Sequence, residues 1–165
     1  MLRQLSVSLL VLLYCVVSFA AQSGLPSRKS DDLYLRAFAA FLEKRNFMYE
    51  GNDFLRKQNY LNVLVEKDLQ LTEGLPTTIG KNSVEYLDYA GRVDRYKRLR
   101  SELRIIVLRP AKNAGNTLIF SFSEYLWSIK GNKTYYALSD GARVSMKFDC
   151  IKQEFVVDSV ELWGV

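Results

Sequence analysis

The chain has 165 residues, of which 48% are hydrophobic and 25% are charged, and its formal net charge at pH 7 is +5. This length and apolar content predict one domain with a core of its own rather than a disordered chain. The sequence contains no histidine, which excludes serine-histidine and cysteine-histidine nucleophiles and histidine-ligated zinc. We expect no metal and no cofactor, and the small basic excess does not predict nucleic-acid binding.

Residues 1–20 have the composition of a secretory signal peptide. Arg3 supplies the positive charge, residues 5–19 form a largely apolar run, and Ala20 ends it with a small residue at a cleavable position. We therefore expect a secreted, extracellular protein with no membrane segment after cleavage, and an uncleaved anchor is the alternative. Cleavage would also remove Cys15 and leave Cys150 as the single cysteine, which excludes an intramolecular disulfide.

Residues 21–30 have the composition of a flexible linker, and residues 31–165 are expected to form a single domain. A first amphipathic helix is predicted from Ser30 to about Met48, because apolar residues recur at helical spacing. These residues are Tyr34, Ala37, Phe38, Phe41 and Leu42. Such an aromatic stripe is typical of a core, and the alternative is that it lines a ligand cavity.

The segment that follows is predicted to contain two more helices around a short strand. Weaker amphipathic spacing indicates a helix over residues 53–67, and alternation at Leu69 and Leu71 indicates a strand and loop over residues 68–78. A third helix is then expected from Asn82 or Ser83, with its inner face formed by Val84, Leu87 and Ala90. The basic residues are densest over residues 92–112. We interpret that run as a solvated helix end, with an anionic partner as the alternative.

Residues 103–163 alternate apolar and polar side chains in four runs that are separated by turns. Connections of hairpin length predict an antiparallel meander, because parallel strands need longer crossovers. The clearest alternation places Val144, Met146, Phe148 and Cys150 on one face. It predicts a buried, unreactive thiol at Cys150.

The order of these elements resembles the nuclear transport factor 2-like superfamily, which includes ketosteroid isomerases and SnoaL-type cyclases. The resemblance rests on the loop from Asp68 to Gly80, on the hairpin from Phe148 to Val157, and on the element order between Leu33 and Trp163. It implies an α+β fold in which N-terminal helices pack on a curved antiparallel sheet around a cone-shaped pocket. Cystatins have a similar shape, but the Gln-Val-Val-Ala-Gly loop and the paired cysteines are absent.

Two carboxylates lie at positions where the alternation expects apolar side chains. Glu124 shares a face with Phe120 and Phe122, and Asp158 shares one with Val156 and Val160. Polar groups in an apolar pocket are typical of ligand sites. The alternatives are that Glu124 reaches water at a bulge or pairs with Arg109. The sequence therefore predicts a ligand pocket, and its candidate residues are Phe38, Phe41, Phe120, Phe122, Glu124 and Asp158.

The expected function is non-enzymatic binding of a small apolar ligand or a protein partner, through this pocket or the sheet face. The resemblance also leaves open a homodimer through the sheet face. An isomerase or cyclase that uses a pocket carboxylate and a tyrosine is one alternative, and a cystatin-shaped secreted inhibitor is another. Asn132 begins an Asn-Lys-Thr sequon in an expected turn, which predicts glycosylation in a eukaryotic host.

Overall fold

The computed structural model describes residues 28–51 and 60–164. The predicted signal peptide and most of the predicted linker lie outside these residues. The chain divides into Met1–Ser30 and a second unit, Asp31–Val165, whose fold is described here. In the described part of the chain, no helix has both the length and the apolar character that crossing a membrane requires.

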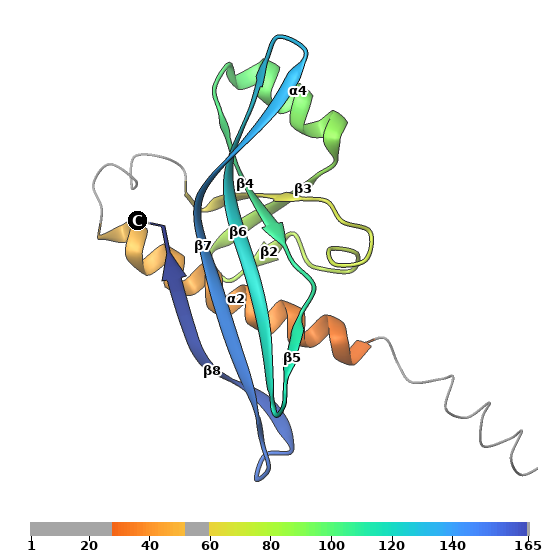
Figure 1. Cartoon of the computed structure of the whole chain (residues 1–165), viewed down its shortest axis with the longest axis vertical. Helices are drawn as coiled ribbons and strands as arrows, with labels where there is room; N and C mark the ends of the chain where they lie inside the picture. The colour runs from red at the N-terminus through yellow and green to blue at the C-terminus, as the bar shows by residue number, and fades with distance from the viewer. Residues whose placement is uncertain (1–27, 52–59, 165) are drawn as a thin grey trace, which may run out of the picture. The chain divides into compact units, whose positions relative to one another are not determined.

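The second unit is an α+β domain in which two helices pack against a mixed, mostly antiparallel sheet (Figure 1). The helices are α2 (Arg28–Glu50) and α4 (Tyr89–Leu99), and the strands are β1 (Asn62–Glu66), β2 (Thr78–Ile79), β3 (Asn82–Leu87), β4 (Leu103–Leu108), β5 (Lys112–Ala114), β6 (Thr117–Lys130), β7 (Lys133–Asp149) and β8 (Glu154–Trp163). The strand order is β2-β3-β1-β4-β6-β7-β8, and β5 pairs with β6. The α+β class and the predicted meander of β4, β6, β7 and β8 are confirmed.

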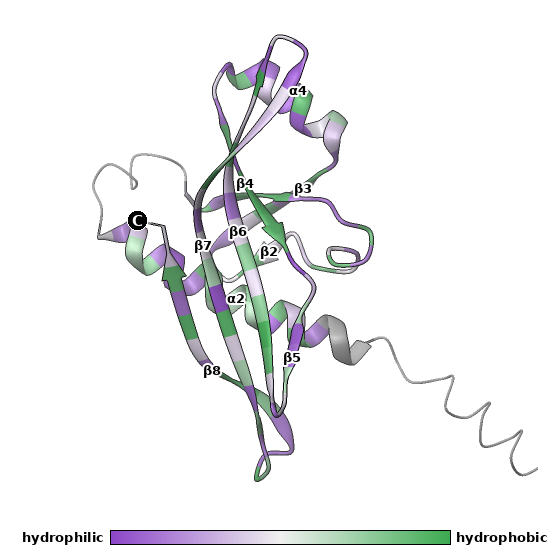
Figure 2. Cartoon of the chain, in the orientation of Figure 1, coloured by the Kyte–Doolittle hydropathy of each residue, from purple (hydrophilic) through white to green (hydrophobic). Residues whose placement is uncertain are grey.

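Helix α2 covers one face of the sheet with the aromatic stripe that the sequence predicts. It begins at Arg28, before Ser30, and ends at Glu50. Phe38 and Phe41 are buried and stack on Phe122 of β6, with ring centroids 5.4 Å and 5.1 Å away. Figure 2 shows hydrophilic and hydrophobic residues alternating along β7 and β8, as expected of strands with one covered face. The main core therefore lies between α2 and the meander.

The two helices predicted near residues 53–67 and after Asn82 are wrong where the structure can be compared. Residues 62–66 and 82–87 are the strands β1 and β3, which pair in parallel, and β1 also pairs in parallel with β4. Val63 and Val65 are buried while their neighbours are less so, which is the two-residue period of a strand. The two parallel strands β1 and β3 therefore extend the predicted meander into a mixed sheet.

Side chains of two aspartates cap the backbone in this region, one at a helix start and one in a turn. Asp88 is the N-cap of α4, where its side chain accepts a hydrogen bond from the Gly91 amide at 2.8 Å. The strand predicted at Leu69 and Leu71 is instead a turn, since the Asp68 side chain accepts hydrogen bonds from the amides of Gln70 and Leu71. The N-cap expected at Asn82 or Ser83 lies instead at Asp88, so α4 begins five or six residues later than predicted.

Helix α4 covers the opposite face of the sheet. Its Tyr96 packs edge to face on buried Trp127, with ring centroids 5.9 Å apart, and donates a hydrogen bond to the carbonyl of Ile129 at 2.9 Å. Within the basic run, Arg92 is buried and pairs with Glu66 of β1. Three exposed cations of this run, Lys97, Arg98 and Arg100, lie near the end of the helix, and Arg109 and Lys112 are exposed after β4.

The predicted burial of Cys150 is wrong. Met146 is buried on the predicted face, but β7 ends at Asp149 and the Cys150 thiol is exposed in the following turn. The Asp149 carboxylate accepts hydrogen bonds from the amides of Ile151 and Lys152, which turns the chain away from the sheet. The alternation therefore stops before the cysteine.

We expect a thiol reagent to modify Cys150 in the native protein about as fast as in urea, because the side chain is exposed. Cys150→Ser should change the free energy of unfolding by less than about 0.5 kcal/mol. Labelling that becomes fast only after unfolding would contradict the exposed position.

Asn132 lies in the turn between β6 and β7, where its side chain is exposed. Glycosylation of this residue stays a prediction. A glycan at this turn would extend into solvent without displacing the core.

Two tyrosines should make the protein less stable at high pH. Burial raises the pKa of Tyr34 from its usual 10.0 to about 12, and burial raises that of Tyr86 to about 12 as well. The Tyr34 hydroxyl donates to the carbonyl of Arg109, and the Tyr86 hydroxyl to the carbonyl of Pro76. Because both phenols ionise more easily in the unfolded chain, their contribution is complete below pH 10 and is lost as the pH rises to about 12.

The urea midpoint should therefore fall between pH 10 and about pH 12. Tyr34→Phe, which cannot ionise, should show a shallower fall over the same interval. If the urea midpoint of Tyr34→Phe fell as steeply with pH as that of the natural chain, ionisation of Tyr34 would not contribute to the loss of stability.

Candidate functional site

Glu124 is the centre of the candidate site. It lies on β6, on the face of Phe120 and Phe122, and it is buried as the alternation predicts. Arg45 in the second half of α2 binds both of its oxygens, with Nε donating to Oε2 at 3.1 Å and Nη2 donating to Oε1 at 3.0 Å. Charge-assisted bonds of this bidentate kind are roughly twice as strong as hydrogen bonds between neutral groups. Arg109 is not the partner, since it donates to the Tyr125 hydroxyl.

A second arginine joins this pair from the neighbouring strand. Arg104 of β4 uses Nη1 to contact the Asp140 carboxylate at 2.8 Å and the Glu124 carboxylate at 3.4 Å. The same atom lies 3.3 Å from the hydroxyls of Tyr49 and Ser139. A register shift between β6 and β7 at this point brings Ser139 and Asp140 beside Glu124. Two arginines and two carboxylates thus form one network.

Tyrosines from either side of the undescribed segment 52–59 complete the network. The guanidinium of Arg45 lies 4.4 Å from the centre of the Tyr49 ring and donates to the Tyr60 carbonyl at 3.0 Å. Tyr49 and Tyr60 meet edge to face, with ring centroids 5.9 Å apart. Arg45 and Tyr49 are four residues apart on α2, which places them on the same face of the helix.

The charges of this network stabilise one another. Burial lowers the pKa of Arg45, but the charge of Glu124 and its hydrogen bonds more than offset this, so the pKa of Arg45 is raised. Burial, together with the Glu124 charge, raises the pKa of Tyr49, so its hydroxyl keeps its proton at neutral pH. The network is therefore a fixed array of charges and hydrogen-bond donors.

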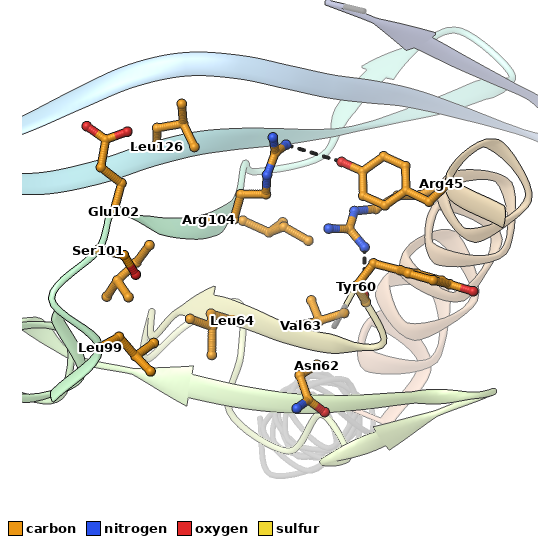
Figure 3. A pocket seen from close by; sticks show the side chains of 13 residues that line it. Arg45, Tyr60, Asn62, Val63, Leu64, Leu99, Ser101, Glu102, Arg104 and Leu126 are labelled. Carbon is orange, nitrogen blue, oxygen red and sulfur yellow. Dashed lines mark hydrogen bonds between the residues drawn. The ribbon is translucent and has the colours of Figure 1, made fainter. Parts of the chain in front are cut away.

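The network forms one side of a pocket of about 570 Å³, which we call the arginine pocket (Figure 3). Its polar lining is Arg45, Tyr49, Tyr60, Asn62, Ser101, Glu102 and Arg104. Its apolar lining is Val63, Leu64, Leu99, Leu103, Ile106 and Leu126. Figure 3 shows Arg45 and Tyr60 at one end of the pocket, and Leu99 at the other end together with Ser101 and Glu102. Strands β1, β4 and β6 and the loop that follows α4 thus build an amphipathic cavity.

The structure separates the other predicted pocket residues from the arginine pocket. Phe38, Phe41, Phe120 and Phe122 are buried side chains of the main core. Phe41 and Glu124 share a recess of only about 10 Å³, which is about the smallest volume that holds one water. Asp158 lies at a register shift on β8, where its side chain is exposed and pairs with Lys147 at 2.9 Å, and it does not line the arginine pocket.

A second hollow lies along the outer side of α2. It has a volume of about 910 Å³ and lies against β2 and β8, and we call it the helix groove. Its apolar side chains include Ile79, Val157 and Phe47, and Phe47 is 75% exposed. The helix groove has no charge network comparable with that of Glu124 among the described residues.

Sequence reasoning missed most of the arginine pocket. The signals were Arg45 and Tyr49 on the core side of the first helix, and Arg104 on the face of Ile106 in a strand that is otherwise apolar. The pocket also needs β1, which the sequence misassigns as helix. Among the residues that the structure describes, no group of histidine, cysteine, aspartate and glutamate side chains has the arrangement of a metal site.

Comparison with protein families, with curated proteins and with solved structures finds no match for this chain. The site must therefore be interpreted from its own geometry and chemistry.

Proposed function

We propose that this protein binds a small amphipathic molecule in the arginine pocket and does not transform it. The observation that carries the proposal is that the pocket combines six apolar side chains with the fixed charges and hydrogen-bond donors of the arginine network. Ligand sites commonly have volumes of about 300 to 1,000 Å³, apolar walls and a few placed polar groups. The volume of about 570 Å³ lies within that range.

The state of Glu124 supports binding over catalysis. Arg45 binds both of its oxygens, and Arg104 lies within contact distance of one of them. A carboxylate that acts as a general base must reach the proton it removes, within about 2.6 to 3.2 Å. Arginine donors already occupy that shell around Glu124, so we propose that its role is to hold the two arginines in place.

The proposal includes the cellular setting and the finer fold description. The apolar run over residues 5–19 supports export by a signal peptide, so we propose that binding takes place outside the cell. The packing of helix α2 against the antiparallel meander supports a further proposal about the fold: that this is a cone-shaped domain of the nuclear transport factor 2-like type.

Binding of the neutral dye Nile red tests the pocket without involving ligand charge. We expect saturable binding with increased fluorescence, and we expect Ser101→Trp to weaken it about tenfold or more, because the indole would fill space at the pocket wall. Ser83→Trp is the matched control, since Ser83 is exposed on β3 and does not line the pocket. Equal dye binding by both variants would place the site elsewhere, and no saturable binding would remove the proposal.

A further inference from the structure

We infer that the ligand of the arginine pocket carries a carboxylate, which Arg104 binds while the apolar part of the ligand lies along Leu64, Leu99 and Leu126. This inference rests on the proposed function and names the chemical class of its ligand. It follows from the donors of Arg104, from the charges around the pocket and from the shape of the apolar lining.

Arg104 lines the pocket and has guanidinium donors with no partner among the described residues. In the described part of the chain, every hydrogen bond that its side chain donates leaves from Nη1. A guanidinium carries five N–H donors in a planar fork, and those on Nε and Nη2 match the two oxygens of a carboxylate. The Arg104 side chain is 28% exposed and lines the pocket, whereas Arg45 is buried and engaged with Glu124 and Tyr60.

Neighbouring groups favour an anion with a single charge. The Tyr49 hydroxyl accepts from Arg104 and keeps its own proton, so it can donate to a ligand oxygen. Exposed cations at the end of α4, namely Lys97, Arg98 and Arg100, flank the pocket residues Leu99 and Ser101 and would attract an anion. Three acids, Glu102 in the lining and Glu124 and Asp140 beside Arg104, oppose negative charge, and so they disfavour a dianionic phosphate more strongly than a carboxylate with one charge. A carboxylate fits these constraints best.

The apolar lining accounts for the rest of the ligand. Leu99 lies at the far end of the pocket from Arg45, and Leu64 and Leu126 line the space near Arg104 (Figure 3). A hydrocarbon tail that runs toward Leu99 would bury apolar surface while its acid group stays on Arg104. An amphipathic monocarboxylate, such as a medium-chain fatty acid, therefore satisfies both sides of the pocket.

Three amphiphiles of equal chain length test the charge preference in the natural chain: decanoate, decanol and decylamine, each titrated calorimetrically below its micelle-forming concentration. We expect decanoate to bind about tenfold or more tightly than decanol, because a charge-assisted hydrogen bond has about that effect. Decylamine should bind most weakly. Equal affinity of all three would overturn the carboxylate assignment and leave the proposed binding function standing. If none of the three bound, both the carboxylate assignment and the proposed binding function would be overturned.

Variants test the role of Arg104. Arg104→Gln should remove the preference for decanoate over decanol, whereas Arg104→Lys should keep part of it because the charge remains. Arg143→Gln is the matched control, since this strand arginine is exposed and pairs only loosely with Glu161, at 4.0 Å. Thermal melts would establish that each variant is folded. A preference for decanoate that survives in folded Arg104→Gln would overturn the assignment of Arg104.

Discussion

Replacing Glu124 by leucine should lower the free energy of unfolding by about 3 to 5 kcal/mol, because it removes one partner of a buried ion pair. Arg45 would remain buried beneath the sheet without the two carboxylate oxygens that it now binds. The sequence alone suggests the opposite, since an unpaired buried carboxylate would be better replaced by leucine. The position of Arg45 reverses the sign of the expected effect.

Urea denaturation of Glu124→Leu measures this effect, and a double variant provides the control. Arg45→Met combined with Glu124→Leu replaces the whole pair by apolar side chains and should recover most of the lost stability. A single Glu124→Leu variant as stable as the natural chain would show that the pair contributes nothing to folding.

Phe122→Ala should also cost about 3 to 5 kcal/mol, which is the range for truncating a buried phenylalanine. Phe122 is fully buried and stacks on both Phe38 and Phe41 from α2. Removing the ring would leave a cavity between the helix and the sheet that the main core cannot readily close.

Phe47→Ala is the matched control, because this helix phenylalanine is exposed and its truncation should change stability by about 0.5 kcal/mol or less. Calorimetric melts of the two variants would separate them. If Phe122→Ala melted like Phe47→Ala, the aromatic cluster would not be the core of the domain.

Local patterns in the sequence predict about half of this fold. The helical spacing of Phe38 and Phe41 and the alternation of Phe120 and Phe122 each identify one layer of the core, and both are confirmed. These two elements are predicted correctly because one face of each is buried and the other is not, so the spacing of apolar residues shows in the sequence. The prediction that Cys150 is buried fails because the Asp149 side chain binds the Ile151 amide and ends the strand. Alternation carries no information on where a strand ends.

The prediction of β1 and β3 as helices fails for a different physical reason. β1 and β3 are short, and their apolar residues also satisfy helical spacing, so the period does not separate the two structures. β1 pairs with β3 and with β4, and these pairings join residues that are distant in the sequence, such as Leu64 and Ile105. Tertiary pairing therefore decides their structure.

The candidate site is predictable in part. The alternation of β6 points Glu124 inward, but it cannot identify the arginine that meets it, because Arg45 lies 79 positions away on a helix. The predicted ring-lined pocket is instead filled by the rings themselves. The cavity lies next to the charge network, beside Arg104, which is the one charged residue of the otherwise apolar strand β4.

Methyl-selective NMR of the leucine, isoleucine and valine side chains during titration with decanoate tests the binding account most directly. The account predicts shifts concentrated at Leu64, Leu99 and Leu126, which line the arginine pocket. Shifts confined to Ile79 and Val157 would place the ligand in the helix groove and contradict it.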